Sequence, residues 1–241
     1  MRRSVVALLV AVGLLAGCAE RTALPEPTLS PAVKDTATLV RVLTSRAAEQ
    51  RSVRFTARTG IPGRVVELTG GLLRTPEGRL LTAREDGVTD LVVTAEAGFS
   101  RESGAPWVRH GLAERLQGRS ATTSVGLVDE VDPVDVADGL TGGMIVEVGG
   151  EALDGVTTRR YTMLVDLRQQ AARTPDPDLR GRLLGAYDSG FTGTAVVWVG
   201  PGDLPVKVEQ TLTTLEDKVF LQTTHTFTDW NSDVRVRAPI S

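Results

Sequence analysis

The spacing of hydrophobic positions changes about one fifth of the way along the chain. Between Val33 and Ala47, apolar side chains recur at helical intervals, with charged side chains between them. Ser30 followed by Pro31 suits the N-cap and first turn of a helix, so the pattern predicts one amphipathic helix from this pair to about Gln50. Apolar and polar residues then alternate, which is typical of half-buried strands.

Short alternating runs fill most of the remaining chain, and turn signals such as Thr75-Pro76-Glu77-Gly78 and Asp86-Gly87 separate them. The predicted strands cover residues 53–58, 64–73, 79–84, 89–95, 107–109, 144–148, 157–166, 194–199, 205–215 and 218–227. Weaker helical signals cover residues 111–118 and a segment that begins near Asp178. Closely spaced strands joined by tight turns favour an antiparallel sheet over βαβ units, which need crossover helices.

The acidic stretch from Asp129 to Asp138 admits two interpretations. Carboxylates are ligands that calcium prefers, but the stretch lacks the Asp-x-Asp-x-Asp-Gly loop with a distal Glu. Asp132 before Pro133 instead suits a helix N-cap followed by acidic residues in the first turn. We favour the N-cap.

The N-terminus has the pattern of an export signal. Arg2 and Arg3 precede an uncharged run from Val5 to Ala16, which is too short to span about 30 Å of hydrocarbon as a permanent helix. The run ends in Leu15-Ala16-Gly17-Cys18, which matches the bacterial lipobox. The sequence therefore predicts a lipoprotein signal peptide over residues 1–17 and lipidation of Cys18. The alternative is an ordinary secretory signal followed by a chance cysteine.

On the lipobox interpretation, we expect the chain to have three segments. Residues 1–17 are the signal peptide, residues 18–30 are a proline-rich tether, and residues 31–241 are a single domain. An extended tether of this length could lift the domain by roughly 40 Å at about 3.1 Å per residue. The expected location is the extracytoplasmic face of the cell membrane, with the domain anchored by lipid.

Composition and charge narrow the function classes. Cys18 is the only cysteine, so lipidation leaves no thiol for a disulfide, a metal or a nucleophile. Losing Arg2 and Arg3 with the leader moves the formal net charge from −3 to −5, and no basic face is concentrated in the sequence. A nucleic-acid partner is therefore not expected.

The sequence offers little catalytic chemistry. His110 and His225 are each isolated from an obvious carboxylate or nucleophile, and no phosphate loop, nucleophile elbow or Cys/His metal set is present. His225 lies in the threonine-rich run 223–226 and is expected to face solvent. We expect no enzyme activity, no cofactor and no metal site.

The order of these pieces resembles one group of actinobacterial lipoproteins. A lipobox, a tether, one helix, hairpin strands and an Asp-Pro helix start are followed by the run 150–161, by Val196-Val197-Trp198-Val199 and by Thr228-Asp229-Trp230-Asn231. This arrangement resembles the LppX/LprA/LprF/LprG lipoproteins and, more distantly, the LolA and LolB lipoprotein carriers. Asn231 stands where that pattern has glycine, a difference expected to affect a turn.

The resemblance implies an α+β fold, with a large curled antiparallel sheet forming an unclosed β-barrel around a few helices. It further implies an aliphatic cavity that accepts acyl chains of a lipid or lipoglycan. The alternative is a non-carrier surface lipoprotein that interacts with a membrane sensor or transporter, and an enzyme acting on envelope lipids is a more distant one. The candidate cavity residues are inward positions of the predicted strands: Phe55, Leu68, Leu72, Leu91, Val93, Met163, Val165 and Val196.

Overall fold

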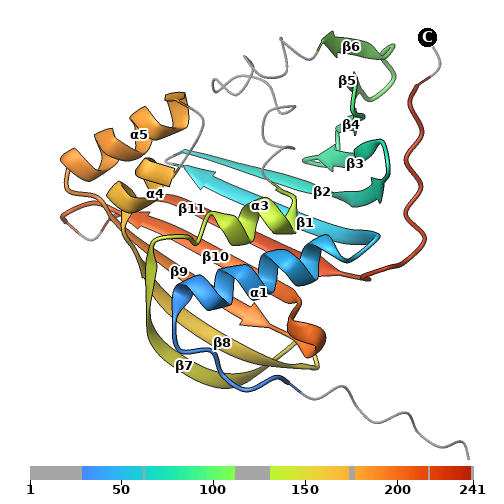
Figure 1. The fold of residues 1–241 in the computed structure, drawn as a ribbon. Coiled ribbons are helices and arrows are strands. Elements are labelled where there is room, and N and C mark those ends of the chain that lie inside the picture. The colour runs from blue at the N-terminus through green and yellow to red at the C-terminus, as the bar shows by residue number, and fades with distance from the viewer. Residues whose placement is uncertain (1–28, 62, 112–130, 174–176, 217, 240–241) are drawn as a thin grey trace, which may run out of the picture.

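The computed structural model describes residues 29–61, 63–111, 131–173, 177–216 and 218–239. Outside these residues lie the predicted signal peptide, Cys18 and most of the tether. The predicted helical segment 111–118 also lies outside them, except for Gly111. Helices of the described part all lie on one side of a curled sheet (Figure 1). They are α1 (Thr36–Ala48), α3 (Pro133–Asp138), α4 (Leu167–Arg173) and α5 (Pro177–Asp188), with a short 3₁₀ turn, η2 (Pro201–Asp203).

The described strands form one antiparallel sheet of 11 strands. Their bounds are β1 (Ser52–Ile61), β2 (Arg64–Thr75), β3 (Gly78–Glu85), β4 (Thr89–Val93), β5 (Ala97–Glu102), β6 (Val108–Gly111), β7 (Gly143–Leu153), β8 (Val156–Val165), β9 (Thr192–Val199), β10 (Pro205–Thr213) and β11 (Val219–Thr228). The order across the sheet is β6-β5-β4-β3-β2-β1-β11-β10-β9-β8-β7, so β6 and β7 are its edges and the sheet is not closed. The expected α+β fold with a large, unclosed antiparallel sheet is confirmed.

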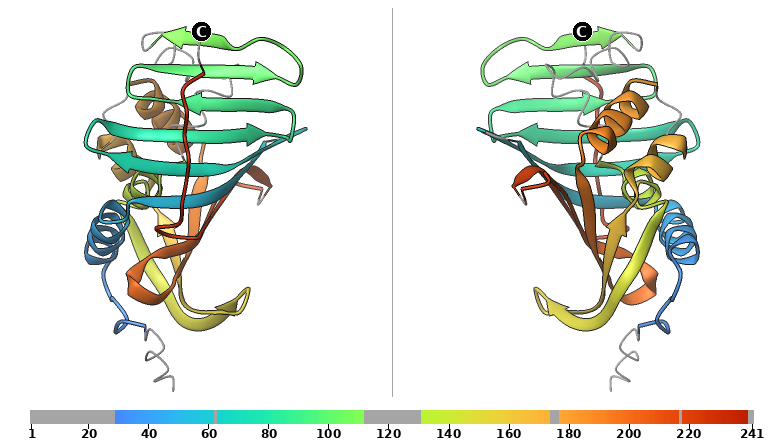
Figure 2. Two further views of the ribbon diagram at one scale, coloured as in Figure 1. Left: turned by 90° about the vertical axis from the view of Figure 1, so that its right-hand side faces the viewer. Right: turned by 90° about the vertical axis from the view of Figure 1, so that its left-hand side faces the viewer.

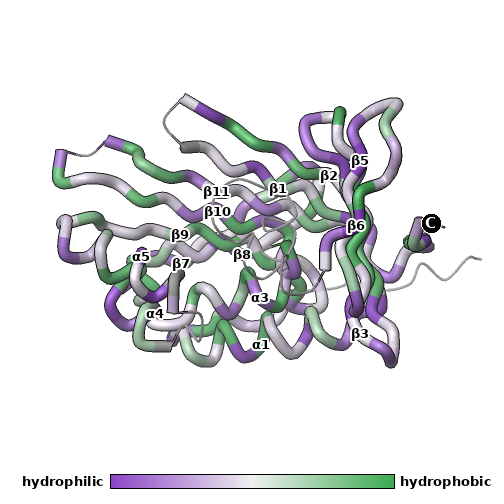
Figure 3. Tube along the Cα trace, turned by 90° about the horizontal axis from the view of Figure 1, so that it is seen from above, coloured by the Kyte–Doolittle hydropathy of each residue, from purple (hydrophilic) through white to green (hydrophobic). Residues whose placement is uncertain are grey.

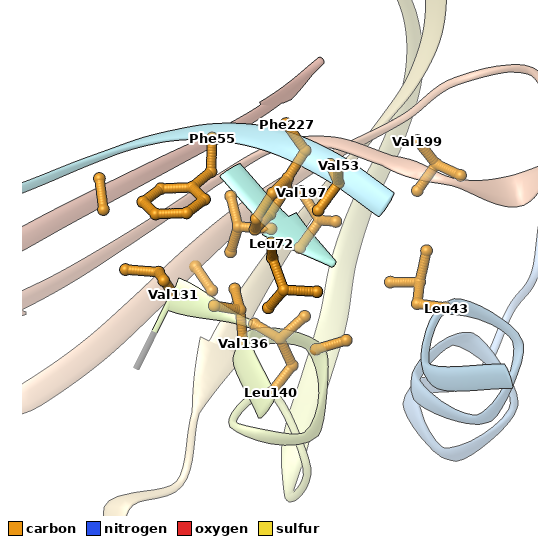
Figure 4. Packing of buried hydrophobic residues seen from close by; sticks show 14 of the residues in the cluster. Leu43, Val53, Phe55, Leu72, Val131, Val136, Leu140, Val197, Val199 and Phe227 are labelled. Atoms are coloured by element: carbon orange, nitrogen blue, oxygen red, sulfur yellow. The ribbon is translucent and has the colours of Figure 1, made fainter. Parts of the chain in front are cut away.

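The core lies between the inner face of the sheet and helices α1 and α3. Phe55 and Phe227 come from the paired central strands β1 and β11, and Leu43 and Leu140 belong to the same buried cluster on the helical side (Figure 4). Each of these side chains is almost fully buried. Burying a side chain of this size contributes about 1.5–3 kcal/mol, so this layer holds the helices on the sheet.

Helix α1 begins five residues after the Ser30-Pro31 pair that the sequence suggested. The Asp35 side chain caps it by accepting a hydrogen bond from the Thr38 N–H at 2.8 Å. The preceding residues are not helical and are bound from outside the helix: the Ser30 hydroxyl donates to Asp203, and the Val33 N–H donates to the Tyr161 hydroxyl at 3.1 Å. The expected helix is confirmed, and its expected start was wrong because these tertiary contacts compete with the Ser-Pro signal.

Two adjacent glycines of β2 permit close packing on opposite faces of the sheet. A Cβ atom on Gly70 would lie 2.1 Å from the Thr82 carbonyl oxygen and 3.0 Å from the Phe55 ring. A Cβ atom on Gly71 would lie 2.8 Å from a Val234 methyl group. Val234 belongs to the C-terminal segment, which crosses the outer face of the sheet (Figure 2).

Most predicted strands are present, with two differences in detail. Strand β5 was not predicted, because Ala97–Glu102 has no sustained apolar alternation and forms through pairing with β4 and β6. Strand β7 continues through Gly149 and Gly150 to Leu153, past the predicted end at Val148. Asn231 has a φ of 59°, so the position where the family pattern has glycine is indeed a turn with left-handed backbone.

Candidate functional site

A cavity of about 340 Å³ lies between the inner face of the sheet and helices α3, α4 and α5. Ligand pockets in proteins begin at roughly this size, about 300 Å³. Strands β8 to β11 supply its floor. Its apolar lining combines residues from α3, β8, α4, α5, β10 and β11: Val136, Val165, Leu167, Leu183, Leu212 and Leu221.

Polar side chains line part of the same cavity. Asp135 and Arg182 bring charge from α3 and α5, whereas Gln210, Thr223 and His225 come from the floor. A second hollow of about 20 Å³ lies under Val131 and shares Thr223 and His225 with the larger cavity. These two side chains therefore lie where the two spaces meet.

His225 is buried, contrary to the expectation that it faces solvent. Alternation along β11 places it on the same face as Phe227, and the two rings stack at 6.3 Å between centroids with 6° between their planes. Only 9% of His225 is exposed. Burial disfavours the imidazolium and lowers the pKa of His225 from 6.5 to about 4, so the ring is neutral at neutral pH.

Asp132 fixes α3 at the edge of the cavity. Its carboxylate accepts two hydrogen bonds from Arg74, at 2.6 and 3.0 Å, and one from Arg79 at 2.9 Å. It also caps α3 by accepting from the Val134 N–H, which confirms the N-cap interpretation of this acidic stretch for its described residues. Helix α3 is thereby tied to β2 and β3.

The ionised form of Asp132 is held by its partners. Burial acts to raise the pKa of this carboxyl, but the hydrogen bonds from Arg74 and Arg79 outweigh burial and lower the pKa below 3.8. A further bond ties the helices together, because the Gln170 amide of α4 donates to the Gly139 carbonyl at 2.7 Å. The cavity roof is therefore attached through polar contacts as well as apolar packing.

The sequence-derived cavity candidates fall into three groups. Val165 lines the cavity, and Leu68 lines the small hollow. Val196 lies on the outer face, because its neighbours Ala195 and Val197 are the buried positions of β9. The others pack in the buried core without lining the larger cavity: Phe55, Leu72, Leu91, Val93 and Met163.

Several cavity residues were not among the candidates. Leu212 and Leu221 occupy directly paired positions of β10 and β11, and Leu183 approaches from α5. In β11, Leu221, Thr223 and His225 lie on the same face as the apolar residue Phe227. This alternation could have indicated that all three point toward the interior. Nothing in the local sequence indicated which residues α5 would bring to the same space.

A larger groove of about 400 Å³ lies on the outer face, beneath the C-terminal segment. Its lining is polar, and most of its charges are paired within the groove: Arg84 pairs with Asp90 at 2.9 Å, and Arg235 pairs with Asp233 at 2.9 Å. A groove of paired charges does not suit an acyl chain. Hydrophobic and hydrophilic residues both occur along the strands (Figure 3), and the apolar residues Leu212 and Leu221 line the inner cavity.

The two histidines are not brought together. His110 lies on the edge strand β6 and contacts the Ser100 hydroxyl at 2.8 Å, whereas β11 is central in the sheet. Within the described residues, no cluster of three or more His, Cys, Asp or Glu side chains could hold a metal ion. Among the same residues, no helix combines the length and the apolar character needed to cross a membrane.

Two solved structures share this architecture. LprF from Mycobacterium bovis is 15% identical with a TM-score of 0.52, over 86% of this chain and 97% of LprF. The lipoprotein LppX from Mycobacterium tuberculosis is 15% identical with a TM-score of 0.52, over 84% of this chain and 98% of LppX. This chain has the LppX and LprF fold. No family model matches the sequence, and no curated protein matches it, so the likeness to LppX and LprF rests on the fold.

Proposed function

We propose that this protein binds the acyl chains of a lipid or lipoglycan in the cavity beneath α3, α4 and α5, and carries or presents that lipid at the membrane. The observation that carries the proposal is the apolar part of the cavity in a fold shared with the lipoprotein LppX. Each buried methylene contributes about 0.8 kcal/mol, so an acyl chain can be held without a charged contact. The proposal needs no catalytic group.

A filled cavity should weaken lipid binding. In a Leu183→Trp, Leu212→Trp double variant, indole rings enter the cavity from α5 and β10. Excluding even two methylenes, at about 0.8 kcal/mol each, weakens binding by roughly tenfold or more. We expect lipid recovered from the full chain in organic extracts to fall by at least that factor, as measured by mass spectrometry.

The matched control places the same two substitutions outside the cavity. Leu184 and Leu215 are exposed, Leu215 to 79%, so Leu184→Trp with Leu215→Trp leaves the cavity unchanged. This control should carry as much lipid as the unaltered chain. Absence of lipid from the unaltered chain, with no uptake of an added fluorescent fatty acid, would overturn the proposed function.

We further propose that lipid on Cys18 holds the domain at the extracytoplasmic face of the membrane. Cys18→Ala removes the attachment site, and we expect the chain to move from the membrane fraction to the soluble fraction once its signal has been cleaved. Each buried methylene of an anchor contributes about 0.8 kcal/mol, and two or more acyl chains are needed for stable attachment. Retention of the cleaved Cys18→Ala chain on membranes would contradict lipid anchoring.

A further inference from the structure

Two buried polar atoms in the cavity wall have no hydrogen-bond partner among the described residues. They are Nδ1 of His225 and the hydroxyl oxygen of Thr223. Both side chains line the larger cavity and the small hollow next to it. They lie two residues apart on β11, so they project from the same face of the strand. The imidazole lies nearly parallel to the Phe227 ring, with 6.3 Å between the ring centroids.

Polar side chains on the two neighbouring strands lie beside Thr223 and form a polar band with it. The strand register places Thr223 opposite Thr59 of β1 on one side and opposite Gln210 of β10 on the other. Thr59 lines the small hollow, and Gln210 lines the cavity. The next row of the sheet is apolar around His225, which pairs with Ala57 and Val208. A polar band thus crosses three strands of a mainly apolar wall.

The chemistry of this band favours a neutral partner. His225 is uncharged at neutral pH, because burial lowers its pKa to about 4, so it offers an anion no charge attraction. A neutral imidazole has one donor and one acceptor nitrogen, and a threonine hydroxyl both donates and accepts. A hydroxyl group on a ligand can therefore satisfy both side chains, whichever imidazole tautomer is present.

We propose that the cavity selects acyl chains that carry a neutral oxygen group, above all a hydroxyl, at the depth of Thr223 and His225. This inference rests on the proposed function, because it assigns the class of acyl chain that the same cavity takes. A plain alkyl chain would cover the two polar atoms without giving them partners, and leaving buried polar groups unpaired disfavours binding.

The test is a competition between plain and hydroxylated acyl chains. The full chain, held in amphipol, is incubated with an equimolar mixture of stearate and stearates that carry one hydroxyl at different carbons along the chain. Bound lipids are then extracted and quantified by mass spectrometry. We expect at least one hydroxylated isomer to be enriched about tenfold over stearate, because it alone supplies the missing hydrogen bonds.

Three variants locate the selectivity. Thr223→Val is nearly isosteric and His225→Leu is similar in size, and each should remove most of the enrichment of the hydroxylated stearate over stearate. Thr224→Val is the matched control, since alternation along β11 turns Thr224 toward the opposite face of the sheet. It should keep the enrichment.

The outcomes separate this inference from the proposed function. Equal recovery of all the stearates from the unaltered chain would overturn the inference, because water would then serve the two polar atoms, while lipid binding would stand. Enrichment that survives both Thr223→Val and His225→Leu would also overturn it. Recovery of neither stearate nor any hydroxylated stearate would overturn both proposals.

Discussion

Replacing Asp132 with alanine is expected to lower the free energy of unfolding by about 3 to 5 kcal/mol at neutral pH, the usual range when one partner of a buried ion pair is removed. The Asp132 side chain is only 3% exposed and Arg74 only 21%. The substitution leaves the largely buried Arg74 without its carboxylate and removes the N-cap of α3. Urea denaturation followed by circular dichroism measures the loss.

Asp135 on the same helix provides the matched control. Its side chain is 49% exposed and pairs with Arg79, which is 46% exposed, so Asp135→Asn should cost less than about 1 kcal/mol. Asp132→Asn separates the two roles of Asp132, since asparagine still caps a helix while losing the charge. Similar losses for Asp132→Ala and Asp135→Asn would show that the buried carboxylate does not hold α3 in place.

Asp132 also shows what the sequence could establish about the fold. An aspartate before proline, followed by acidic residues, predicts a helix start from local chemistry alone, and α3 begins there. Its partners Arg74 and Arg79 could not be predicted, because they reach it from strands more than fifty residues away in the chain. Local signals located elements, and long-range contacts decided where some of them begin.

The helix before β1 is a second example of that limit. Ser30-Pro31 and Asp35 are both acceptable helix starts, and the sequence gives no reason to reject the first pair. Contacts with Asp203 and Tyr161, which lie more than a hundred residues away, bind Ser30 and Val33 outside the helix. Strand β5 is the converse case: its residues have little strand pattern of their own, and pairing with both neighbours forms it.

The cavity was less predictable than the sheet for a related reason. Alternation identifies two faces of a strand, but it identifies the buried one only where that face is clearly more apolar. In β11 both faces carry threonine, so His225 was assigned to solvent although Phe227 lies on its own face. The candidates were chosen for hydrophobicity, and most of them are core residues. The position of the cavity depends on how α3, α4 and α5 pack on the sheet, and local sequence patterns do not reveal that packing.

Lowering the pH from above 6.5 to about 4 is expected to destabilise the protein by about 3 kcal/mol through His225 alone. Its pKa is 6.5 in the unfolded chain and about 4 in the folded protein, so only the unfolded state takes up a proton between these values. Stability therefore falls as the pH falls through this window, by up to about 1.4 kcal/mol per pH unit. Above 6.5 the ring is neutral in both states and contributes no pH dependence.

Urea denaturation across the window, on the unaltered chain and on His225→Leu, measures this contribution as the difference between their two slopes. Asp135 and Arg182, the charged residues that line the same cavity, are present in both proteins, so their contributions cancel. Asp132 acts in a different range: its pKa is lowered below 3.8, so its stabilisation persists above that value and is lost only at lower pH. If the free energy of unfolding depends equally on pH in the two proteins between pH 6.5 and 4, the His225 ring must reach solvent in the folded state. Thr223 and His225 would then be hydrated inside the cavity.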